Sequence, residues 1–181
     1  MIRIIGGKYR RSKIDFPISK DVRPTQDRIR EAVFSILHEK ILGAVCLDLF
    51  AGSGAYGFEA LSRGAKFVDF VDKQNICIKC IESNATRLKC QESMKIYKKD
   101  YALAVDSFIL QNKKYDIIFL DPPYAMDVND RLASIFIKKN LLKEHGILVV
   151  EQEKELLPID GYSLKRYKYS YKHIGIYQRG E

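Results

Sequence analysis

The sequence predicts an α/β protein built on a mostly parallel β-sheet with helices on both faces. From residue 45 onward, short apolar segments alternate with segments of helical periodicity. The apolar segments are hydrophobic on both faces, as in parallel strands that helices cover on both sides. After residue 160 come two polar/aromatic segments with no helix between them, which indicates an antiparallel hairpin that closes the sheet.

The N-terminal region is expected to add a small hairpin and one helix. Two short strands, 2–5 and 9–14, flank the glycine turn Gly6-Gly7. An amphipathic helix is expected to begin at Thr25, a candidate N-cap, and to end near Gly43. The chain is therefore expected to be one domain over residues 1–181, with a basic hairpin extension at 1–24 and a main body at 25–181.

The main body is expected to contain strands and helices in alternation. Strands are expected at 45–50, 67–71, 94–97, 115–120 and 146–151, helices at 54–63, 75–88, 101–110 and 128–142, and the closing hairpin at 162–171 and 174–179. Tyr167, Tyr169 and Tyr171 fall on one face of that hairpin. We expect this face to pack against a helix, which is commoner than stacking on nucleic-acid bases.

Length and composition indicate a globular protein of the cytoplasm. The 181 residues are 46% hydrophobic, enough for one sizeable core. No apolar run approaches the roughly 20 residues that cross a bilayer, and the N-terminus has too short an apolar stretch for a signal peptide. Cys77 and Cys80 form a C-x-x-C, but no second Cys or His pair stands nearby to complete a metal site. We expect buried, reduced thiols.

The net charge of +8 is concentrated at the two ends of the chain. Residues 1–30 carry +6 and residues 161–181 carry +4, whereas residues 31–160 carry −2. Basic ends around a near-neutral middle suit a body flanked by surfaces that meet a polyanion. They would equally keep a protein soluble, and composition alone does not separate these interpretations.

A glycine-rich turn after the strand at 45–50 indicates a ligand site. Gly52, Gly54 and Gly57 satisfy G-x-G-x-x-G, so a dinucleotide enzyme has to be considered. Asp48, however, places a carboxylate immediately before the turn, where a dinucleotide site keeps the strand end apolar for the pyrophosphate. A carboxylate there suits a cationic ligand such as the aminoacyl part of S-adenosylmethionine.

Acidic residues also end the next two expected strands. Asp72 could hold ribose hydroxyls, a feature shared with NAD enzymes. Asp100 could accept a hydrogen bond from an adenine amino group. Each alone is more often an ordinary strand-end or cap residue, but three acids at successive strand ends after a glycine turn indicate a nucleoside site.

The most specific motif is Asp121-Pro122-Pro123-Tyr124 at the end of the strand at 115–120. The prolines remove two N–H donors, so the Asp121 side chain and nearby carbonyls form an acceptor-only cluster. Hydrogen bonds from an exocyclic amine to Asp121 and to the Pro122 carbonyl would draw the nitrogen lone pair out of the base toward a methyl donor. Tyr124 could stack on a flipped-out base.

With these motifs, the sequence resembles the RsmD-type family, the 16S ribosomal RNA guanine-N2 methyltransferases. The resemblance covers nearly the whole chain, through RIIGGKYR, RPTQDRIREAVFSIL, LDLFAGSGAYGFEALSRGA and FLDPPY. DPPY alone also fits adenine-N6 and cytosine-N4 methyltransferases. The RPT segment followed by R-x-R-E-A-x-F favours the guanine-N2 family among these. The family implies a Rossmann-like, class I S-adenosylmethionine-dependent fold with seven strands, of which the last is antiparallel.

The resemblance implies roles for particular residues. It places the catalytic group at Asp121, Pro122, Pro123 and Tyr124, and S-adenosylmethionine at Asp48, Ala51, Gly52, Ser53, Gly54, Asp72 and Asp100. Contacts to RNA are expected from Arg3, Lys8, Arg10, Arg11, Arg23, Thr25 and Arg28. Family members commonly have Glu where this chain has Asp72, and the shorter acid still reaches a ribose. The tail beyond residue 160 departs further from the family pattern.

The implied function is methylation of a guanine N2 amino group in bacterial small-subunit ribosomal RNA, within an assembling or assembled subunit, with no metal and no membrane. A DNA adenine-N6 or cytosine-N4 methyltransferase is the second hypothesis, although 181 residues leave little room for a target-recognition segment. An RNA-binding module without catalysis is the third, and it would need neither the glycine turn nor DPPY.

Overall fold

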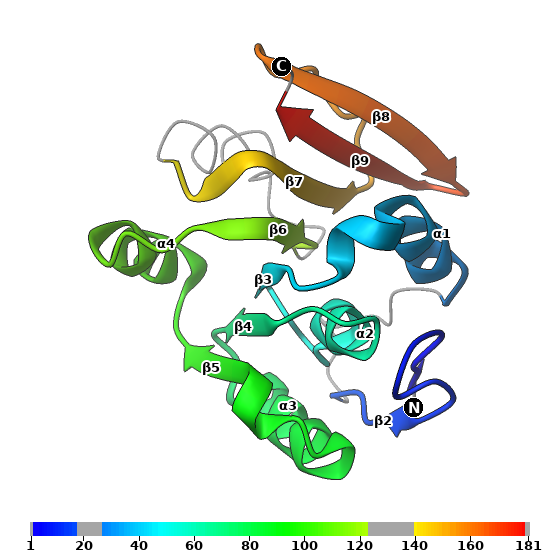
Figure 1. Cartoon of the computed structure of the whole chain (residues 1–181), viewed down its shortest axis with the longest axis vertical. Helices are drawn as coiled ribbons and strands as arrows, with labels where there is room; N and C mark the ends of the chain where they lie inside the picture. The colour runs from blue at the N-terminus through cyan, green and yellow to red at the C-terminus, as the bar shows by residue number, and fades with distance from the viewer. Residues whose placement is uncertain (1, 18–26, 123–139, 180–181) are drawn as a thin grey trace.

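The computed structural model describes residues 2–17, 27–122 and 140–179, and it contains a seven-stranded sheet with helices on both faces (Figure 1). The strand order is β5-β4-β3-β6-β7-β9-β8, in which β9 pairs antiparallel with both β7 and β8, and the other pairs are parallel. This agrees with the fold expected from the sequence. No helix in the described part of the chain is long and apolar enough to span a membrane.

The elements of the main body follow the predicted alternation. In chain order they are β3 (Val45–Leu49), α2 (Ala55–Ser62), β4 (Phe67–Asp72), α3 (Asn75–Leu88), η2 (Gln91–Ser93), β5 (Met94–Lys98), α4 (Tyr101–Leu110), β6 (Tyr115–Leu120), β7 (Leu142–Gln152), β8 (Tyr162–Tyr169) and β9 (Lys172–Arg179). The helices and strands among them agree with expectation within two residues, except β7, and the 3-10 turn η2 was not predicted.

β7 begins four residues before its predicted start. Leu142 pairs with Tyr115, and the register then shifts before Ile117 pairs with Ile147. The intervening segment is polar and includes His145 at φ 60°, so its pattern does not resemble a strand, and pairing with β6 holds it in the sheet. Most of the helix expected at 128–142 lies outside the described residues, and its predicted end at Leu142 is wrong.

The N-terminal hairpin is shorter than predicted. β1 (Ile2–Arg3) and β2 (Lys13–Ile14) pair antiparallel, and the residues between them form turns. Gly7 at φ 75° and Arg11 at φ 68° interrupt the extended backbone, so the predicted strand at 9–14 is reduced to its last two residues. The helix predicted to follow is α1 (Asp27–Leu37), which continues as the 3-10 turn η1 (His38–Ile41). The proposed N-cap, Thr25, lies outside the described residues.

Two apolar clusters fill the space between the sheet and its helices. One lies under α1, α2, α3 and the N-terminal hairpin, and the other lies under α4, which Figure 1 shows on the opposite side of the sheet from α1 and α2. Tyr167 and Tyr169 pack partly buried against the first cluster, as expected. Tyr171 lies in the turn after β8 and is 47% exposed, so the packing expected for it is wrong. Strands between two helical layers expose their carboxyl ends at one edge, where ligands bind in such folds.

Candidate active site at the carboxyl edge of the sheet

The glycine turn and the Asp-Pro motif lie on adjacent strands. β3 and β6 pair in parallel with Leu49 opposite Leu120, so the turn after β3 and Asp121 after β6 leave the same edge side by side. The chain adds β4 and β5 on one side of β3, and β6 and β7 on the other. This edge is therefore the point where the strand order reverses, which is where open α/β sheets form a ligand crevice.

The turn itself uses left-handed backbone conformations. Phe50, Gly52 and Gly54 have φ of 64°, 56° and 77°. A Cβ on Gly54 would lie 2.6 Å from Cε2 of Phe58, so only glycine fits there. Phe50 is unusual as a bulky residue in this region, and its ring lies 5.1 Å from that of Tyr101. This local strain at the predicted cofactor turn is typical of a functional site.

Asp48 lies under the turn rather than in the open crevice. Its side chain is buried and accepts a 2.9 Å hydrogen bond from the backbone N–H of Gly57. Burial raises the pKa of Asp48 well above its usual value, and the nearby charges of Asp121 and Asp72 raise it further. Three carboxylates thus act on one another at this edge, and a cationic ligand would relieve their repulsion.

Asp72 and Asp100 also make backbone contacts. Asp72 accepts hydrogen bonds from the N–H of Gly52 at 2.9 Å and from that of Gln74 at 2.8 Å. Asp100 caps α4, because its side chain accepts a 3.0 Å hydrogen bond from Ala102. These backbone contacts leave room for a ligand, because each carboxylate oxygen has a second lone pair. The roles of Asp72 toward a ribose and of Asp100 toward an adenine stay predictions.

The hydrogen bonds that Asp48 and Asp72 accept from the glycine turn argue against a dinucleotide site. The N–H groups of Gly52 and Gly57, which a pyrophosphate would need, already donate to Asp72 and Asp48. A Cβ on Gly57 would lie 2.2 Å from Cε1 of Phe70, so this glycine serves the packing of α2 on β4.

The predicted catalytic motif is only partly described. Asp121 is half-buried and Pro122 is buried at the end of β6, whereas Pro123 and Tyr124 lie outside the described residues. Ala51, Ser53 and the glycines of the turn are buried around the same edge. Within the described part of the chain no group of three His, Cys, Asp or Glu side chains could hold a metal ion.

Sequence reasoning missed three buried residues beside this motif. Tyr56 in α2 donates a hydrogen bond to Glu151 at the end of β7, and Lys172 in β9 pairs with the same carboxylate. Glu151 follows the apolar run Ile147–Val150, so the rule that singled out acids at strand ends would have found it. The sequence around Lys172 does not predict that it contacts Glu151, because the pairing of β7 with β9 brings these two residues together.

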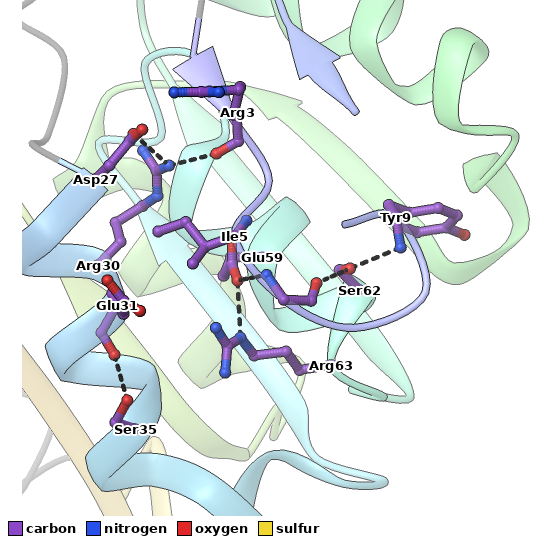
Figure 2. Close-up of polar contacts among 11 residues, drawn as sticks. Arg3, Ile5, Tyr9, Asp27, Arg30, Glu31, Ser35, Glu59, Ser62 and Arg63 are labelled. Carbon is purple, nitrogen blue, oxygen red and sulfur yellow. Dashed lines mark hydrogen bonds and ion pairs between the residues drawn. The ribbon is translucent and has the colours of Figure 1, made fainter. Parts of the chain in front are cut away.

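The predicted RNA-binding residues of the hairpin are exposed on a firmly anchored element. Arg3, Lys8, Arg10, Arg11 and, on α1, Arg28 are exposed. Figure 2 shows the anchor: the Glu59 carboxylate of α2 accepts hydrogen bonds from the N–H groups of Ile5 at 2.8 Å and Gly6 at 2.9 Å. Ser62 accepts another from Tyr9. Arg23 and Thr25 lie outside the described residues.

The tip of the hairpin is remote from the glycine turn. Its anchors Glu59 and Ser62 belong to the second half of α2, whereas the turn precedes the first residue of this eight-residue helix. An α-helix of that length extends about 12 Å. The basic tip is therefore suited to contact a large ligand at a distance from the crevice.

Comparison with known proteins identifies relatives along the whole chain. Residues 2–178 match the family model described as "Conserved hypothetical protein 95". A protein of Haemophilus influenzae named ribosomal RNA small subunit methyltransferase D is 35% identical over 154 residues, covering 85% of this chain and 80% of the relative. The protein of the same name from Buchnera aphidicola is 36% identical over 182 residues, covering 97% and 91%.

Solved structures give the same result for the fold. A protein from Escherichia coli, described as a candidate methyltransferase, superposes with a TM-score of 0.85 at 32% identity over 98% of this chain and 97% of its own. A second candidate methyltransferase, solved with SAH, has a TM-score of 0.68 at 16% identity over 94% of this chain and 52% of its own, and so shares the fold. With a family model along nearly the whole chain and more than a third of aligned residues identical in both curated relatives, this chain belongs to the RsmD-type methyltransferase family.

Proposed function

We propose that this protein transfers a methyl group from S-adenosylmethionine to the exocyclic N2 amino group of a guanine in small-subunit ribosomal RNA. The observation that carries the proposal is the adjacency of the glycine turn and Asp121-Pro122 at the point where the strand order reverses. The names of the curated relatives, ribosomal RNA small subunit methyltransferase D, support the substrate class.

The residues at the edge fit a cationic nucleoside. S-adenosylmethionine supplies an electrophilic methyl on a sulfonium, together with an ammonium group. The carboxylates of Asp48, Asp72 and Asp121, which influence one another in the free protein, provide a negative environment for these cations. Gly52 and Gly54 allow close approach of the backbone, and Asp72 and Asp100 are assigned to the ribose and the adenine.

The Asp-Pro motif acts on the amine. Its nitrogen is a weak nucleophile because its lone pair is delocalised into the base. Hydrogen bonds donated by the amine to the Asp121 carboxylate and to the Pro122 carbonyl orient the lone pair toward the methyl group. As the N–C bond forms and the C–S bond breaks, the nitrogen loses one proton, which the Asp121 carboxylate can accept. Alignment alone can supply several kcal/mol of the barrier, on the order of a thousandfold in rate.

The exposed basic residues of the N-terminal hairpin form a separate contact surface for the RNA. Because the tip lies about one α2 length from the turn, we assign Lys8, Arg10 and Arg11 to phosphates away from the target base. Such contacts add affinity and register without reading the base. A large folded substrate would bridge the two places, which suits an RNA within a ribosomal subunit.

Replacement of Asp121 tests this function. Asp121→Ala should abolish methyl transfer to unmodified small ribosomal subunits and leave the dissociation constant of S-adenosylmethionine within a few-fold of wild type, because the side chain is assigned to the amine. Calorimetry measures the binding, and incorporation of labelled methyl measures the transfer. Wild-type turnover by the variant would refute the assignment. Transfer by the wild type to DNA in place of ribosomal subunits would favour the DNA alternative.

A further inference from the structure

Three buried side chains from separate elements form a chain of contacts next to the Asp-Pro motif. The hydroxyl of Tyr56 donates a 2.9 Å hydrogen bond to Oε2 of Glu151, and Nζ of Lys172 donates to Oε1 of the same carboxylate. Tyr56 is 4% exposed, Glu151 2% and Lys172 4%. An ion pair this deeply buried is costly to desolvate, so it points to a role beyond stability.

The sheet register brings Glu151 beside Asp121. β6 and β7 pair in parallel with Leu120 opposite Val150, so Asp121, the first residue after β6, leaves the sheet beside Glu151 of β7. Neighbouring strands of a sheet lie about 4.8 Å apart. The Glu151 side chain points to the face under α1 and α2, because side chains alternate and Val149, two residues earlier, lies in the core cluster on that face. The charge of Asp121 reaches Tyr56 on the same side. The ring of Tyr56 stacks on Phe119 at 5.1 Å, which places it under the same edge.

Negative groups predominate around Asp121. Asp48 at the end of β3, Asp72 at the end of β4 and Glu151 at the end of β7 all approach this edge. The positive groups on this side in the described residues are Lys172 of β9 and Arg30 of α1, whereas His173 alternates to the opposite face of β9 with Tyr177. Burial and the charges of Glu151 and Asp121 raise the pKa of Tyr56, so its hydroxyl stays a donor.

We propose that Lys172 is a positioning residue that keeps Asp121 ionised for catalysis, by neutralising the buried carboxylate of Glu151 on the neighbouring strand. Two adjacent carboxylates in a poorly solvated place favour sharing a proton, and a protonated Asp121 could accept fewer hydrogen bonds from the amine. The hydroxyl of Tyr56 donates to the other oxygen of Glu151, so both oxygens of this buried carboxylate already accept a hydrogen bond. This inference rests on the proposed function of Asp121.

The proposal predicts opposite effects for the two partners on the pH dependence of transfer. Lys172→Met removes the positive charge that faces Glu151, so the acid limb of the single-turnover rate should move to higher pH by about one unit. Glu151→Gln removes the negative charge that Lys172 neutralises and leaves the positive charge near Asp121, so the acid limb should move to lower pH. The double variant Glu151→Gln/Lys172→Met removes both charges, and its acid limb should return close to that of wild type.

The experiment measures single-turnover methyl transfer to small ribosomal subunits against pH for these variants. Lys143→Met is the matched control, because Lys143 pairs with Asp116 at 2.9 Å near the opposite ends of the same two strands. Its acid limb should coincide with that of wild type. Because Lys172→Met removes the cation beside a buried carboxylate and could fail to fold, Glu151→Gln and the double variant carry the test without it.

The outcomes separate this inference from the proposed function. An acid limb of Glu151→Gln that coincides with wild type, or a double variant shifted as far as a single one, would overturn the role of Lys172 while wild-type transfer sustains the function. A shift in Lys143→Met equal to that in Glu151→Gln would also overturn it, because any loss of an ion pair would then suffice. Absence of transfer by the wild type would instead refute the proposed function itself.

Discussion

At the scale of single residues, Asp48 shows which properties of an acid at a strand end follow from its sequence position and which do not. Its position before the glycines predicted a carboxylate that faces a cationic ligand. The structure places the carboxylate buried beneath the turn, where burial and the charges of Asp121 and Asp72 raise its pKa. Its burial and its bond to Gly57 were not predictable, because they depend on how α2 packs on the sheet. A buried acid with neighbouring acids is a strained group, whose strain a bound cation would relieve.

Replacing Asp48 by asparagine tests this coupling. Because the pKa of Asp48 is raised, the folded protein binds more protons than the unfolded chain at pH values between the usual aspartate pKa and the raised one. The free energy of unfolding therefore falls as pH rises through that window. The asparagine side chain of Asp48→Asn does not titrate, and its amide oxygen can still accept the hydrogen bond from the N–H of Gly57. At neutral pH the free variant should therefore melt higher, on the order of 3 °C, and bind S-adenosylmethionine at least tenfold more weakly.

Thermal melting at pH 5 and pH 8, with and without cofactor, measures both effects. Asp106→Asn on the exposed face of α4 is the control and should show neither. A free Asp48→Asn protein that loses stability at pH 8 as steeply as wild type would show that Asp48 does not titrate as described.

At the scale of elements, the hairpin, α3 and the glycine turn meet at one side chain. Asn84, fully buried in α3, accepts a 2.7 Å hydrogen bond from the N–H of Asp15 and donates to the carbonyls of Asp15 at 3.1 Å and Ser53 at 3.2 Å. The chain after β2 is thereby tied to the predicted cofactor turn. Helical periodicity predicted α3 to the residue, but it treats Asn84 only as a polar interruption on an apolar face.

Removal of this amide should loosen both segments. Asn84→Ala removes the acceptor of the Asp15 N–H and the amide that donates to the buried carbonyl of Ser53, at a cost of about 1–3 kcal/mol. The melting temperature should fall by several degrees, and cofactor affinity should weaken a few-fold. Thr86→Ala is the matched control, since the Thr86 hydroxyl is exposed on the same helix and bonds only within it and to Gln91. Equal melting temperatures for the two variants would contradict this role of Asn84.

The limits of prediction at this scale have a physical pattern. Strands and helices with a clear apolar period, such as α3, α4 and β6, were predicted with their exact ends. The strand at 9–14 failed because turn geometry at Gly7 and Arg11 outweighs strand propensity, and β7 was predicted too short because its first residues owe their strand conformation to β6. Long-range pairing also explains why the contact of Lys172 with Glu151 escaped the sequence.

At the scale of the whole molecule, acidic and basic side chains occupy separate places. The sheet edge gathers acids, which suit a cation, whereas the hairpin at the far end of α2 exposes Lys8, Arg10 and Arg11, which suit a polyanion. Separation of the two prevents the basic surface from neutralising the acids of the crevice. Composition alone left solubility as an equal explanation, and the rigid anchoring of the hairpin favours binding, because a merely solubilising segment needs no buried carboxylate such as Glu59.

Charge reversal tests the hairpin. Arg10→Glu/Arg11→Glu should weaken binding to small-subunit RNA and reduce the slope of log affinity against log salt by about 0.7–0.9 for each lost phosphate contact. Lys79→Glu/Lys95→Glu, which makes the same change in net charge at exposed positions of α3 and β5, is the control and should keep the wild-type slope. An identical loss of slope in both double variants would contradict a specific RNA contact and favour the explanation that the basic hairpin only keeps the protein soluble.

The edge formed by the glycine turn and Asp121-Pro122 is proposed to methylate a guanine amine of small-subunit RNA. Transfer of labelled methyl from S-adenosylmethionine to unmodified small ribosomal subunits, followed by digestion of the RNA and identification of the labelled nucleoside, tests this proposal. We expect the label in N2-methylguanosine. Label in another amino-methylated nucleoside would contradict the assigned base, and absence of label from both RNA and a DNA control would contradict the activity itself.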